Sequence, residues 1–433
     1  MRISVVTLGC KVNQCESAAL TEAFAARGHT AVGPGEPADV CVVNTCTVTG
    51  RTDYQSRQII RKVVRDHPDA TVIVTGCYAQ TRPDAIADIP GVSLIVGTGD
   101  KERIPDLVAE PLGERPGRIV GDPAGIRACS APPLDHFSGH TRAFLKIQDG
   151  CDAFCSYCIV PYARGRSRSL PEEDVLERLR RLGRNGHREV VLTGIHLGAY
   201  GRDLAPPTDL ARLLRRAETA APVERLRLSS LEPLETEGVA GAIRDGRRVC
   251  PHLHIPLQSG DDGILAAMNR HYDSAFFAGL IRRLLDAIPD LGVGVDVLAG
   301  FPGESEAAFL RTVALLEALP IAYLHVFPYS RRPGTAAADR PGQVPEAEKK
   351  SRCETLRALG QRKREAFAER FAGRTLSVLI EEKRDPATGL KRGFSENYIP
   401  VLVEDGPGAA ARRIVPVRTE RASAGRLFGR VAP

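Results

Sequence analysis

Short apolar runs alternate with longer amphipathic stretches over the first hundred residues of the chain. The apolar runs predict strands over residues 3–8, 39–44, 71–75 and 93–96. Apolar positions at helical spacing predict helices over residues 13–27, 52–66 and 83–88. Because strands that alternate with helices build parallel sheets, we expect a parallel α/β domain here, with ligands bound beyond the carboxyl ends of its strands.

The same alternation resumes at residue 143. Strands are predicted over residues 143–148, 189–193, 225–229, 252–256, 293–298 and 321–327, with amphipathic helices between them. Six such units with right-handed crossovers form an open, partial β/α barrel, and the active sites of barrels lie at the carboxyl ends of the strands. Residues 111–142 are rich in Pro, Gly and Arg and lack apolar periodicity, so they are predicted to be a connector.

A third pattern follows residue 345. A charged helical segment runs to about residue 372, and strands are predicted over residues 375–382, 398–404, 413–417 and 425–431. These short strands predict a small β-barrel. The predicted fold is therefore α/β in class. It comprises an N-terminal parallel α/β domain (1–112), a linker (113–136), a central partial (β/α)6 barrel (137–367) and a C-terminal β-barrel (370–433).

The composition of the chain indicates its cellular compartment and the kind of partner it has. The 433 residues are enough for two to four domains, and we find neither a signal peptide nor an apolar run of membrane-spanning length. We therefore expect a cytoplasmic protein with no membrane partner. In that reducing compartment, eleven cysteines favour metal or cluster chemistry over disulfides. Residues 370–433 hold twelve Lys or Arg against seven Asp or Glu, which predicts an anionic partner for this part of the chain.

Three cysteines stand in a CxxxCxxC arrangement just after the first predicted barrel strand. Cys151, Cys155 and Cys158, here called the barrel trio, follow a turn at Gly150, so their thiolates can converge on one inorganic centre. A structural zinc site takes four ligands, and an electron-transfer [4Fe-4S] cluster takes four cysteines. Three thiolates instead leave one iron of a cluster open for a substrate or cosubstrate. The alternative is a zinc site that a distant His or Cys completes.

A second set of cysteines lies at the carboxyl ends of the predicted N-terminal strands. Cys10, Cys46 and Cys77, here called the N-terminal trio, each follow a strand, so the fold itself would bring them together. We predict that they hold a second [4Fe-4S] cluster, again with one open iron. Cys15 lies within a predicted helix and Cys41 within a strand, where buried free cysteine is common, so both are expected to be core residues.

The remaining candidate ligands have no predicted function. No role is assigned to Cys129, Cys250 and Cys353. His196, His252 and His254 are interpreted as structural histidines with satisfied hydrogen bonds. His252 and His254 are expected to place at most one side chain inside the barrel.

Both trios stand in segments that resemble the methylthiotransferase family of radical S-adenosylmethionine enzymes, and the resemblance covers nearly the whole chain. The segments that carry it are residues 8–14 (LGCKVNQ), 44–49 (NTCTVT), 76–80 (GCYAQ), 151–166 (the barrel trio through YARGR), 256–260 (PLQSG), 300–304 (GFPGE), 332–335 (RPGT) and 396–398 (ENY). The resemblance implies an N-terminal cluster domain, a radical S-adenosylmethionine core and a C-terminal TRAM domain. The GCKVNQ opening and residues 162–168 are most similar to the branch that acts on N6-threonylcarbamoyladenosine in tRNA.

The resemblance also implies a reaction. Sulfur and a methyl group are transferred to C2 of the modified adenosine beside the anticodon, giving the 2-methylthio derivative. The implied cofactors are two [4Fe-4S] clusters and S-adenosyl-L-methionine, with the barrel trio catalytic and the N-terminal trio holding the sulfur that is methylated. The C2–H bond is neither acidic nor electrophilic, which is why a radical-generating cofactor is needed. The implied partners are the tRNA anticodon stem-loop, an electron donor such as flavodoxin or ferredoxin, and a sulfur donor that the sequence leaves open.

Other functions stay open at this point. Other members of the family act on isopentenyladenosine in tRNA or on an aspartate of a ribosomal protein. A different class of protein, a noncatalytic zinc-loaded RNA-binding protein, would use the cysteines structurally. A radical enzyme with other chemistry, such as plain methylation, would leave the N-terminal trio without a purpose.

Contacts to S-adenosylmethionine are expected around the ends of the barrel strands. The candidates are Tyr157, Arg166, Thr193, Gly194, Ser230, Glu232, Gly300, Phe301 and Pro302. Tyr157 would pack on the adenine or fill the barrel mouth. The resemblance implies that Thr193 and Gly194 meet the methionyl amine, and Ser230 and Glu232 are placed to meet ribose hydroxyls. The loop at residues 300–303 lets the backbone approach a flat ring closely.

Arginines follow the barrel trio at every second position. Arg164, Arg166 and Arg168 suit the carboxylate of the cofactor or a phosphate of RNA, and the alternative is a solvated basic run.

RNA contacts are expected on the C-terminal barrel. The basic candidates are Arg374, Lys383, Arg384, Lys391, Arg392, Arg412 and Arg413. Phe394 or Tyr398 would stack on an unpaired base, although Tyr398 also suits the core of the barrel.

Overall fold

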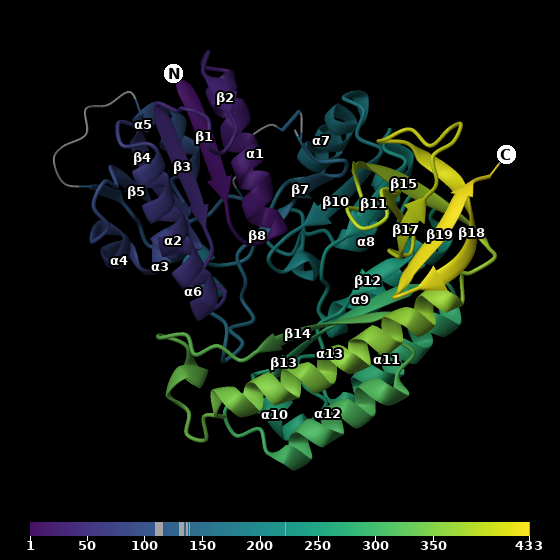
Figure 1. Cartoon of the computed structure of the whole chain (residues 1–433). Coiled ribbons are helices and arrows are strands. Elements are labelled where there is room, and N and C mark those ends of the chain that lie inside the picture. The colour runs from purple at the N-terminus through teal and green to yellow at the C-terminus, as the bar shows by residue number, and fades with distance from the viewer. Residues whose placement is uncertain (109–115, 130–133, 136, 138, 221, 433) are drawn as a thin grey trace.

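The protein, shown in Figure 1 as a computed structural model, has three parts in chain order. The structure describes residues 1–108, 116–129, 134–135, 137, 139–220 and 222–432. An N-terminal α/β domain and a C-terminal β-barrel stand on opposite sides of a central α/β region, and a long helix runs from beneath the centre to the C-terminal barrel.

The N-terminal domain is built on one parallel sheet of six strands in the order β2-β1-β3-β4-β5-β6. The strands are β1 (Arg2–Thr7), β2 (Thr30–Val32), β3 (Val40–Thr45), β4 (Thr71–Gly76), β5 (Leu94–Val96) and β6 (Gly117–Ile119). The helices are α1 (Lys11–Ala25), α2 (Gly50–Asp66), α3 (Cys77–Thr81), α4 (Pro83–Ala87) and α5 (Ile104–Leu107), with a short 3-10 turn η1 (Lys101–Arg103). The parallel α/β prediction is confirmed.

Two strands of this sheet were not predicted. β2 and β6 are each three residues long, too short to show a period, and both lie at edges of the sheet. β6 pairs with β5, with Gly117 opposite Leu94, although it lies within the stretch predicted to be the linker. The linker boundaries near residues 112 and 136 fall outside the described residues, so the domain limits stay predictions.

The central region holds the six predicted strands, all parallel, in two sheets of three. They are β7 (Ala143–Lys146), β10 (Glu189–Thr193), β11 (Arg225–Leu228), β12 (His252–His254), β13 (Gly292–Ala299) and β14 (Tyr323–Pro328). The sheets β7-β10-β11 and β12-β13-β14 meet through a single parallel bridge between Leu226 and Val249, so they form one open barrel wall. The partial barrel is confirmed.

Helices cover this wall. They are α7 (Glu172–Arg184), α8 (Leu210–Ala220), α9 (Pro233–Asp245), α10 (Asp262–Ala267), α11 (Ser274–Ala287) and α12 (Glu306–Ala318), with 3-10 turns η3 (Leu197–Ala199) and η4 (Ala336–Asp339). The short helix α6 (Val160–Arg164) instead packs on α3 of the N-terminal domain and on the 3-10 turn η2 (Pro123–Gly125). A two-residue ladder of β8 (Gln148–Asp149) and β9 (Arg168–Ser169) frames the loop that carries the barrel trio.

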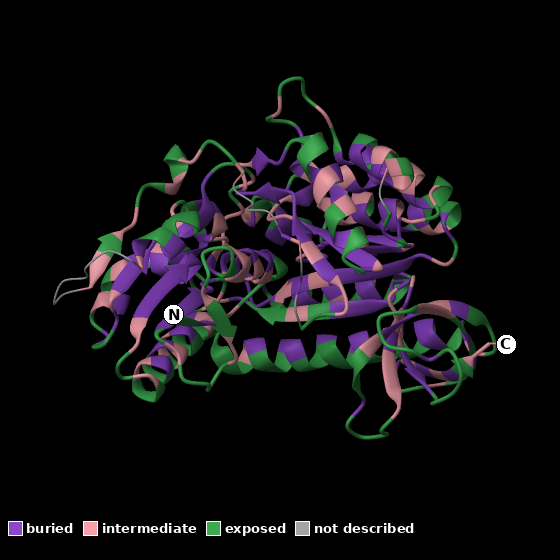
Figure 2. Ribbon diagram, turned by 90° about the horizontal axis from the view of Figure 1, so that it is seen from above, coloured by how far each residue is buried: buried purple, intermediate pink, exposed green. Residues whose placement is uncertain are grey.

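The C-terminal part is a closed barrel of five strands in the order β15-β16-β17-β19-β18. The helix α13 (Glu346–Glu369) leads to β15 (Thr375–Arg384), β16 (Lys391–Ser395), β17 (Pro400–Val403), β18 (Ile414–Ser423) and β19 (Arg426–Val431). The barrel prediction is confirmed, and β16 is a strand that was not predicted. Figure 2 shows α13 with buried and exposed residues alternating along its length, because only one side of it packs on the central region.

The largest hydrophobic cluster fills the central region and reaches into the N-terminal domain. Cys15 of α1 belongs to it, and the backbone N–H of Lys146 on β7 points at its sulfur over 3.4 Å. Cys41 and Cys353 are likewise buried among apolar side chains, whereas Cys250 is buried close to charged groups such as Arg227 and Glu189. Within the described residues, no helix is both long enough and apolar enough to cross a lipid bilayer.

Candidate active site

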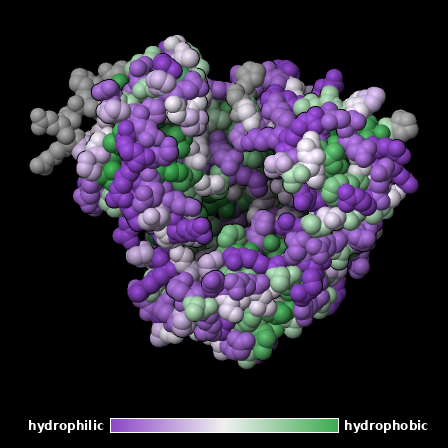
Figure 3. All heavy atoms as spheres, in the orientation of Figure 1, coloured by the Kyte–Doolittle hydropathy of each residue, from purple (hydrophilic) through white to green (hydrophobic). Residues whose placement is uncertain are grey.

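A hollow opens where the three parts of the protein face one another. Figure 3 shows it in the middle of the molecule, with hydrophobic residues deep inside and hydrophilic residues around it. Val48 and Thr49 of the N-terminal domain share the lining of a cavity of about 250 Å³ with Tyr157 and Cys158 of the central region. The two domains therefore contribute to one site.

The N-terminal trio converges as the parallel sheet requires. Cys10 precedes α1, Cys46 follows β3, and Cys77 is the first residue of α3. Gly9 has a φ of +101°, and a Cβ added there would lie 2.6 Å from the Cβ of Cys46, so only glycine allows these two loops to approach. The pKa of the Cys46 thiol is raised to about 11, chiefly by burial and in part by the nearby Cys77 and Cys10 thiols.

Hydrogen bonds tie the three cysteine loops together. The side-chain amide of Asn13 donates to the carbonyls of Leu8, over 2.8 Å, and Thr45, over 2.9 Å. The hydroxyl of Thr45 donates in turn to the carbonyl of Thr75 over 2.5 Å. These bonds join the ends of β1, β3 and β4, which fixes the N-terminal trio relative to one another.

The barrel trio lies on a loop that begins with a tight turn. Gly150 has a φ of +71°, and a Cβ there would lie 1.9 Å from the carbonyl oxygen of Arg166. The backbone N–H of Cys158 donates to the carbonyl of Cys155 over 2.9 Å. The pKa of the Cys158 thiol is raised to about 12, chiefly by burial and in part by the Cys155 and Cys151 thiols. The three sulfurs therefore share one partly buried environment.

The two trios suit a multinuclear cluster better than a single zinc ion. Two sulfurs on one zinc lie at most about 4.6 Å apart, because each Zn–S bond is about 2.3 Å. Among the described residues, the one group of three or more potential ligands whose atoms all lie within 4.8 Å is not either trio but His254, Asp296 and His325. The donor set of three soft thiolates around a cavity fits a [4Fe-4S] cluster with one open iron.

His196 is the residue that would complete a zinc site at the barrel trio. Its Nδ1 lies 3.6 Å from the sulfur of Cys151, and its Nε2 lies 3.0 Å from Glu235. His196 therefore has two hydrogen-bond partners, as the structural interpretation predicted, and it orients Cys151 from outside the trio.

The comparisons with known proteins agree with this geometry. A model of an uncharacterized protein family, UPF0004, matches residues 2–97, and the radical SAM superfamily matches residues 145–316. The threonylcarbamoyladenosine tRNA methylthiotransferase MtaB of Bacillus subtilis (strain 168) is 39% identical over 96% of this chain and 93% of its own length. The protein of the same name from Aquifex aeolicus (strain VF5) is 37% identical over 93% of this chain and 97% of its own length. This chain belongs to the methylthiotransferase family of radical S-adenosylmethionine enzymes.

Two further comparisons involve proteins with other names. A tRNA-2-methylthio-N(6)-dimethylallyladenosine synthase of Jannaschia sp. (strain CCS1) is 34% identical over 99% of this chain and 94% of its own length. The radical S-adenosylmethionine methyltransferase TsrM of Kitasatospora setae has a TM-score of 0.58 at 17% identity, over 82% of this chain and 84% of that chain. The latter likeness supports the fold of this methylthiotransferase and nothing further.

The predicted ribose contact of the methylthiotransferase lies beside the barrel trio. Glu232 lines a cavity of about 290 Å³ together with Cys155. Its carboxylate is already ion-paired with Arg270, which also lies 3.3 Å from the sulfur of Cys155. Arg270 was not predicted, because it follows α10 and is brought to Glu232 only by the fold. Ser230, the second ribose candidate, is exposed at the end of β11.

The other cofactor candidates divide between the cavity and the core. Tyr157 lines the cavity of about 250 Å³ and also packs against the cluster that contains Phe301. Phe301 is fully buried and Pro302 is buried, whereas Gly300 has a φ of +77° and donates its N–H to Glu304 over 2.6 Å. The loop is thus held by the protein core, and its contact with the cofactor stays a prediction.

Thr193 and Gly194 lie at the carboxyl end of β10. Thr193 is buried, and a Cβ at Gly194 would lie 2.7 Å from the side-chain oxygen of Gln148. Glycine is therefore needed at this position for packing on Gln148, whatever binds above it.

The arginine run is not a solvated basic stretch. Arg164 is fully buried and donates to Glu16 over 2.8 Å and to Asp149 over 2.9 Å. Arg168 is buried and donates to backbone carbonyls. Arg166 alone is exposed, with an ion pair to Asp152 over 2.8 Å. Arg164 and Arg168 thus hold the loop and the N-terminal domain in place, and only Arg166 is available to a ligand.

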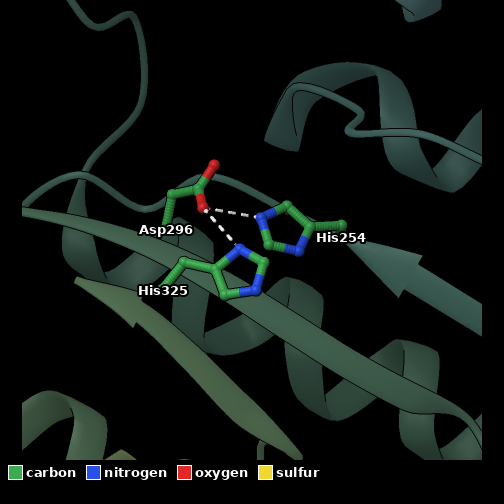
Figure 4. Close-up of side chains that lie close together, drawn as sticks. All are labelled: His254, Asp296 and His325. Carbon is green, nitrogen blue, oxygen red and sulfur yellow. Dashed lines mark hydrogen bonds and ion pairs between the residues drawn. The ribbon is translucent and has the colours of Figure 1, made fainter. Parts of the chain in front are cut away.

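Figure 4 shows His254, Asp296 and His325 pointing toward one another from three adjacent strands, β12, β13 and β14. The Nε2 of His254 lies 2.7 Å and the Nδ1 of His325 lies 3.4 Å from the same carboxylate oxygen. These bonds lower the pKa of Asp296 although burial acts in the opposite direction. The group is a hydrogen-bonded triad on the barrel wall, in agreement with the structural interpretation of His254.

One prediction about the histidines is wrong. His252 and His254 were expected to place at most one side chain inside the barrel. The Nε2 of His252, over 2.8 Å, and the Nδ1 of His254, over 3.2 Å, both bond the hydroxyl of Tyr323. Residues two apart on a strand point to the same face, so both side chains lie on one side of the sheet.

Most basic candidates on the C-terminal barrel have acidic partners on the protein. Ion pairs join Arg374 to Asp290, Arg384 and Lys391 to Asp405, Arg392 to Glu381, and Arg412 to Glu382. Lys383 and Arg413 are exposed, and neither has an ion pair within the described residues. Phe394 stacks on Tyr398 at a centroid distance of 4.9 Å, and both are only partly buried. Among these seven predicted candidates, Lys383 and Arg413 are thus the ones without an acidic partner in the described part of the chain.

Proposed function

We propose that this chain is a tRNA methylthiotransferase that replaces the hydrogen at C2 of N6-threonylcarbamoyladenosine, beside the anticodon, with a methylthio group. The observation that carries the proposal is the likeness, over nearly the whole chain, to five curated relatives with this activity in their names at 33–39% identity. The two cysteine trios beside one shared hollow support it, because the reaction needs two separate chemistries at one nucleoside.

Each trio has a distinct task in this proposal. Cys151, Cys155 and Cys158 hold the [4Fe-4S] cluster that, when bound, supplies the one-electron reduction of S-adenosylmethionine from which radical chemistry starts. Cys10, Cys46 and Cys77 hold the second cluster, at which sulfur is presented. The cavity between Val48, Tyr157 and Cys158 is then the place for the adenine, because both domains line it and Cys158 of the barrel trio is part of its wall.

Residues of the chain would position the cofactor and the RNA. We assign Glu232 and Arg270 to the cavity next to Cys155, where the pair offers a carboxylate for hydroxyl groups and a guanidinium for a carboxylate. Lys383 and Arg413 are assigned to phosphates of the anticodon stem-loop. Phe394, whose ring centroid lies 4.7 Å from the guanidinium of Arg142, is a partly buried aromatic residue on β16, which pairs with the strand that carries Lys383.

The remaining partners follow from the chemistry. A one-electron donor of low potential, such as flavodoxin or ferredoxin, would reduce the cluster of the barrel trio, and an outside sulfur source would renew the sulfur at the N-terminal trio. The reaction would take place in the cytoplasm, where tRNA is found and thiols stay reduced.

The proposal is tested with reconstituted protein and three synthetic anticodon stem-loops. These carry adenosine, N6-threonylcarbamoyladenosine or isopentenyladenosine at the same position. The expected result is a methylthio product from the threonylcarbamoyl substrate at a rate at least about tenfold above the other two, which corresponds to about 1.4 kcal/mol of discrimination. Preference for isopentenyladenosine would transfer the chain to that branch, and no product from any RNA would leave a ribosomal protein aspartate as the target.

A further inference from the structure

A positively charged group of side chains, to which all three parts of the chain contribute, lies beside Cys10 of the N-terminal trio. Lys11 is the first residue of α1, Arg142 immediately precedes β7, and Tyr398 lies in the turn between β16 and β17 of the C-terminal barrel. The groups with the largest electrostatic effect on the Lys11 ammonium are Tyr398, Arg142, Arg227 and Cys10, and none of these four is a carboxylate. We call Lys11, Arg142, Arg227 and Tyr398 the cationic corner.

Charges in the cationic corner are not balanced within the protein. Arg227 is buried and fully engaged by Glu189, over 2.8 Å. Arg142 lies 3.3 Å from Glu381 and 4.0 Å from Glu189, and it shares Glu381 with Arg392 and Glu189 with Arg225 and Arg227. Lys11 is exposed and has no carboxylate within 4 Å in the described part of the chain. An ammonium and part of a guanidinium charge are therefore left for an anion from outside.

The positive charges of Arg142, Lys11 and Arg227 act together on the side chain of Tyr398. Its ring lies 4.8 Å from the guanidinium of Arg227 and 5.5 Å from that of Arg142. Burial alone would raise the pKa of the Tyr398 phenol, yet the charges of Arg142, Lys11 and Arg227 bring it below its ordinary value.

The backbone of Tyr398 is held in an unusual conformation. Its φ is +71°, which is rare for a residue with a large side chain and persists only where the surroundings require it. This conformation places the ring between His252, at 4.5 Å, and Phe394, at 4.9 Å. The ring packs against the hydrophobic core of the C-terminal barrel and also lies close to the guanidinium groups of Arg142 and Arg227.

The chemistry of the proposed substrate matches the corner. N6-threonylcarbamoyladenosine carries a carboxylate and a hydroxyl on its N6 substituent, whereas adenosine and isopentenyladenosine carry no charge there. Lys11 is the neighbour of Cys10, so a nucleoside whose C2 approaches the N-terminal trio brings its substituents within reach of the Lys11 side chain. An ammonium, a guanidinium and a phenol are the donors that a threonine carboxylate and hydroxyl require.

We infer that Lys11 and Arg142 bind the threonine carboxylate of the substrate nucleoside and that Tyr398 hydrogen-bonds the same substituent. This inference rests on the proposed function and adds to it the residues that select the threonylcarbamoyl group. Arg227 is a positioning residue that does not bind the substituent itself, because its own hydrogen bonds go to Glu189 and to backbone carbonyls of the C-terminal barrel.

The test compares substrates that differ only in that carboxylate. Anticodon stem-loops carry N6-threonylcarbamoyladenosine, its methyl ester or plain adenosine, and binding is measured by fluorescence anisotropy with reconstituted protein and S-adenosylmethionine. Wild type should prefer the free acid over the ester by about 10- to 100-fold, the range for hydrogen bonds to a charged group. Lys11→Gln and Arg142→Gln should each reduce that preference to within about threefold and leave binding of plain adenosine nearly unchanged.

Two controls are needed. One tests whether removing any positive charge from the domain has the same effect, and the other tests whether a variant has lost its cluster. Arg61→Gln removes an exposed charge from α2 of the same domain and should keep the wild-type preference. Because Lys11 adjoins Cys10, iron content is measured for Lys11→Gln, and Arg142→Gln gives a second variant with no cysteine beside it.

Two outcomes would overturn the inference. Equal losses for acid, ester and plain adenosine would assign the corner to an RNA phosphate, and an unchanged acid preference in both variants would remove it from recognition. If wild type binds the acid selectively but yields no methylthio product, the proposed function is wrong. If the methylthio product forms but the variants keep the wild-type preference for the acid, only the present inference is wrong.

Discussion

At the scale of single residues, Arg164 and Arg166 are two positions apart and have opposite surroundings. Arg164 is fully buried between Glu16 and Asp149, and Arg166 is exposed beside Asp152. We expect Arg164→Met to destabilise the protein by about 3 kcal/mol, because it leaves two buried carboxylates short of a partner. Arg166→Met, the matched control, should change stability by less than about 1 kcal/mol. Calorimetric melting midpoints of the two variants measure the difference, and equal midpoints would contradict it.

Some of the residues of the site could be identified from the sequence, and others could not. The six cysteines stand out in the sequence because a local motif marks the barrel trio and strand ends mark the N-terminal trio, and their binding of clusters stays a prediction. Arg164 and Arg270 could not be assigned, because their partners Glu16 and Glu232 lie 148 and 38 positions away and leave no local pattern. The prediction for His252 and His254 failed for another reason. It treated two residues that are two positions apart on a strand as if they faced opposite sides of the sheet, whereas such residues face the same side.

At the scale of elements, the two cysteine trios belong to separate structural units and should load independently. Cys151, Cys155 and Cys158 lie on one loop between β8 and α6, and the N-terminal trio spans three strand ends of another sheet. Reconstituted wild type should contain about eight irons per chain, on the basis of two four-iron clusters. A triple alanine variant of either trio should keep about four. Zinc in place of iron, or loss of all iron from one triple variant, would contradict separate clusters.

The C-terminal barrel offers a test of RNA contact on adjacent strands. Lys383 lies on β15 and Arg413 immediately precedes β18, which pairs with β15. If both contact phosphates, the double variant Lys383→Gln, Arg413→Gln should lower the slope of log affinity against log salt by about 1.5, since each contact contributes about 0.7–0.9. Arg244→Gln, an exposed arginine of α9, is the control. Weaker binding with an unchanged slope would remove these two residues from the RNA contact.

Strand length decides which elements the sequence predicts. The long buried strands β3, β4 and β13 stand out as apolar runs, whereas β2 and β6 have three residues each and little to distinguish them from turns. β16 was missed for another reason. Its sequence, Lys391–Ser395, contains two basic residues and a glycine, and it becomes a strand because β15 and β17 pair with it on both sides.

At the scale of the whole molecule, Glu189 connects the C-terminal barrel to the central region. It is fully buried and holds Arg225 and Arg227, which donate to backbone carbonyls of Ser377 and Glu396. Burial would raise the pKa of Glu189, but Arg227, Arg142 and Arg225 lower it to about 2 from 4.5. A depressed carboxyl pKa stabilises the folded state above pH 4.5, and this contribution is lost as pH falls toward 2.

Glu189→Gln tests that linkage. At pH 7 the variant should be less stable than wild type by on the order of 3 kcal/mol, the equivalent of the pKa shift. The difference in melting midpoint should shrink between about pH 5 and pH 3, because the unfolded wild-type chain, in which the pKa of Glu189 is near 4.5, then takes up a proton that the folded protein does not. A difference that stays constant with pH would show that Glu189 does not provide this stabilisation.

The central claim is that this chain forms the 2-methylthio derivative of N6-threonylcarbamoyladenosine in tRNA, and nucleoside mass spectrometry tests it most directly. Total tRNA is compared from cells that lack the gene, cells with the wild-type gene restored, and cells with the Cys151, Cys155 and Cys158 triple alanine variant. We predict that the methylthio nucleoside is absent without the gene, returns with wild type and stays absent with the variant, while unmodified N6-threonylcarbamoyladenosine accumulates. An identical nucleoside profile in all three strains would contradict the account.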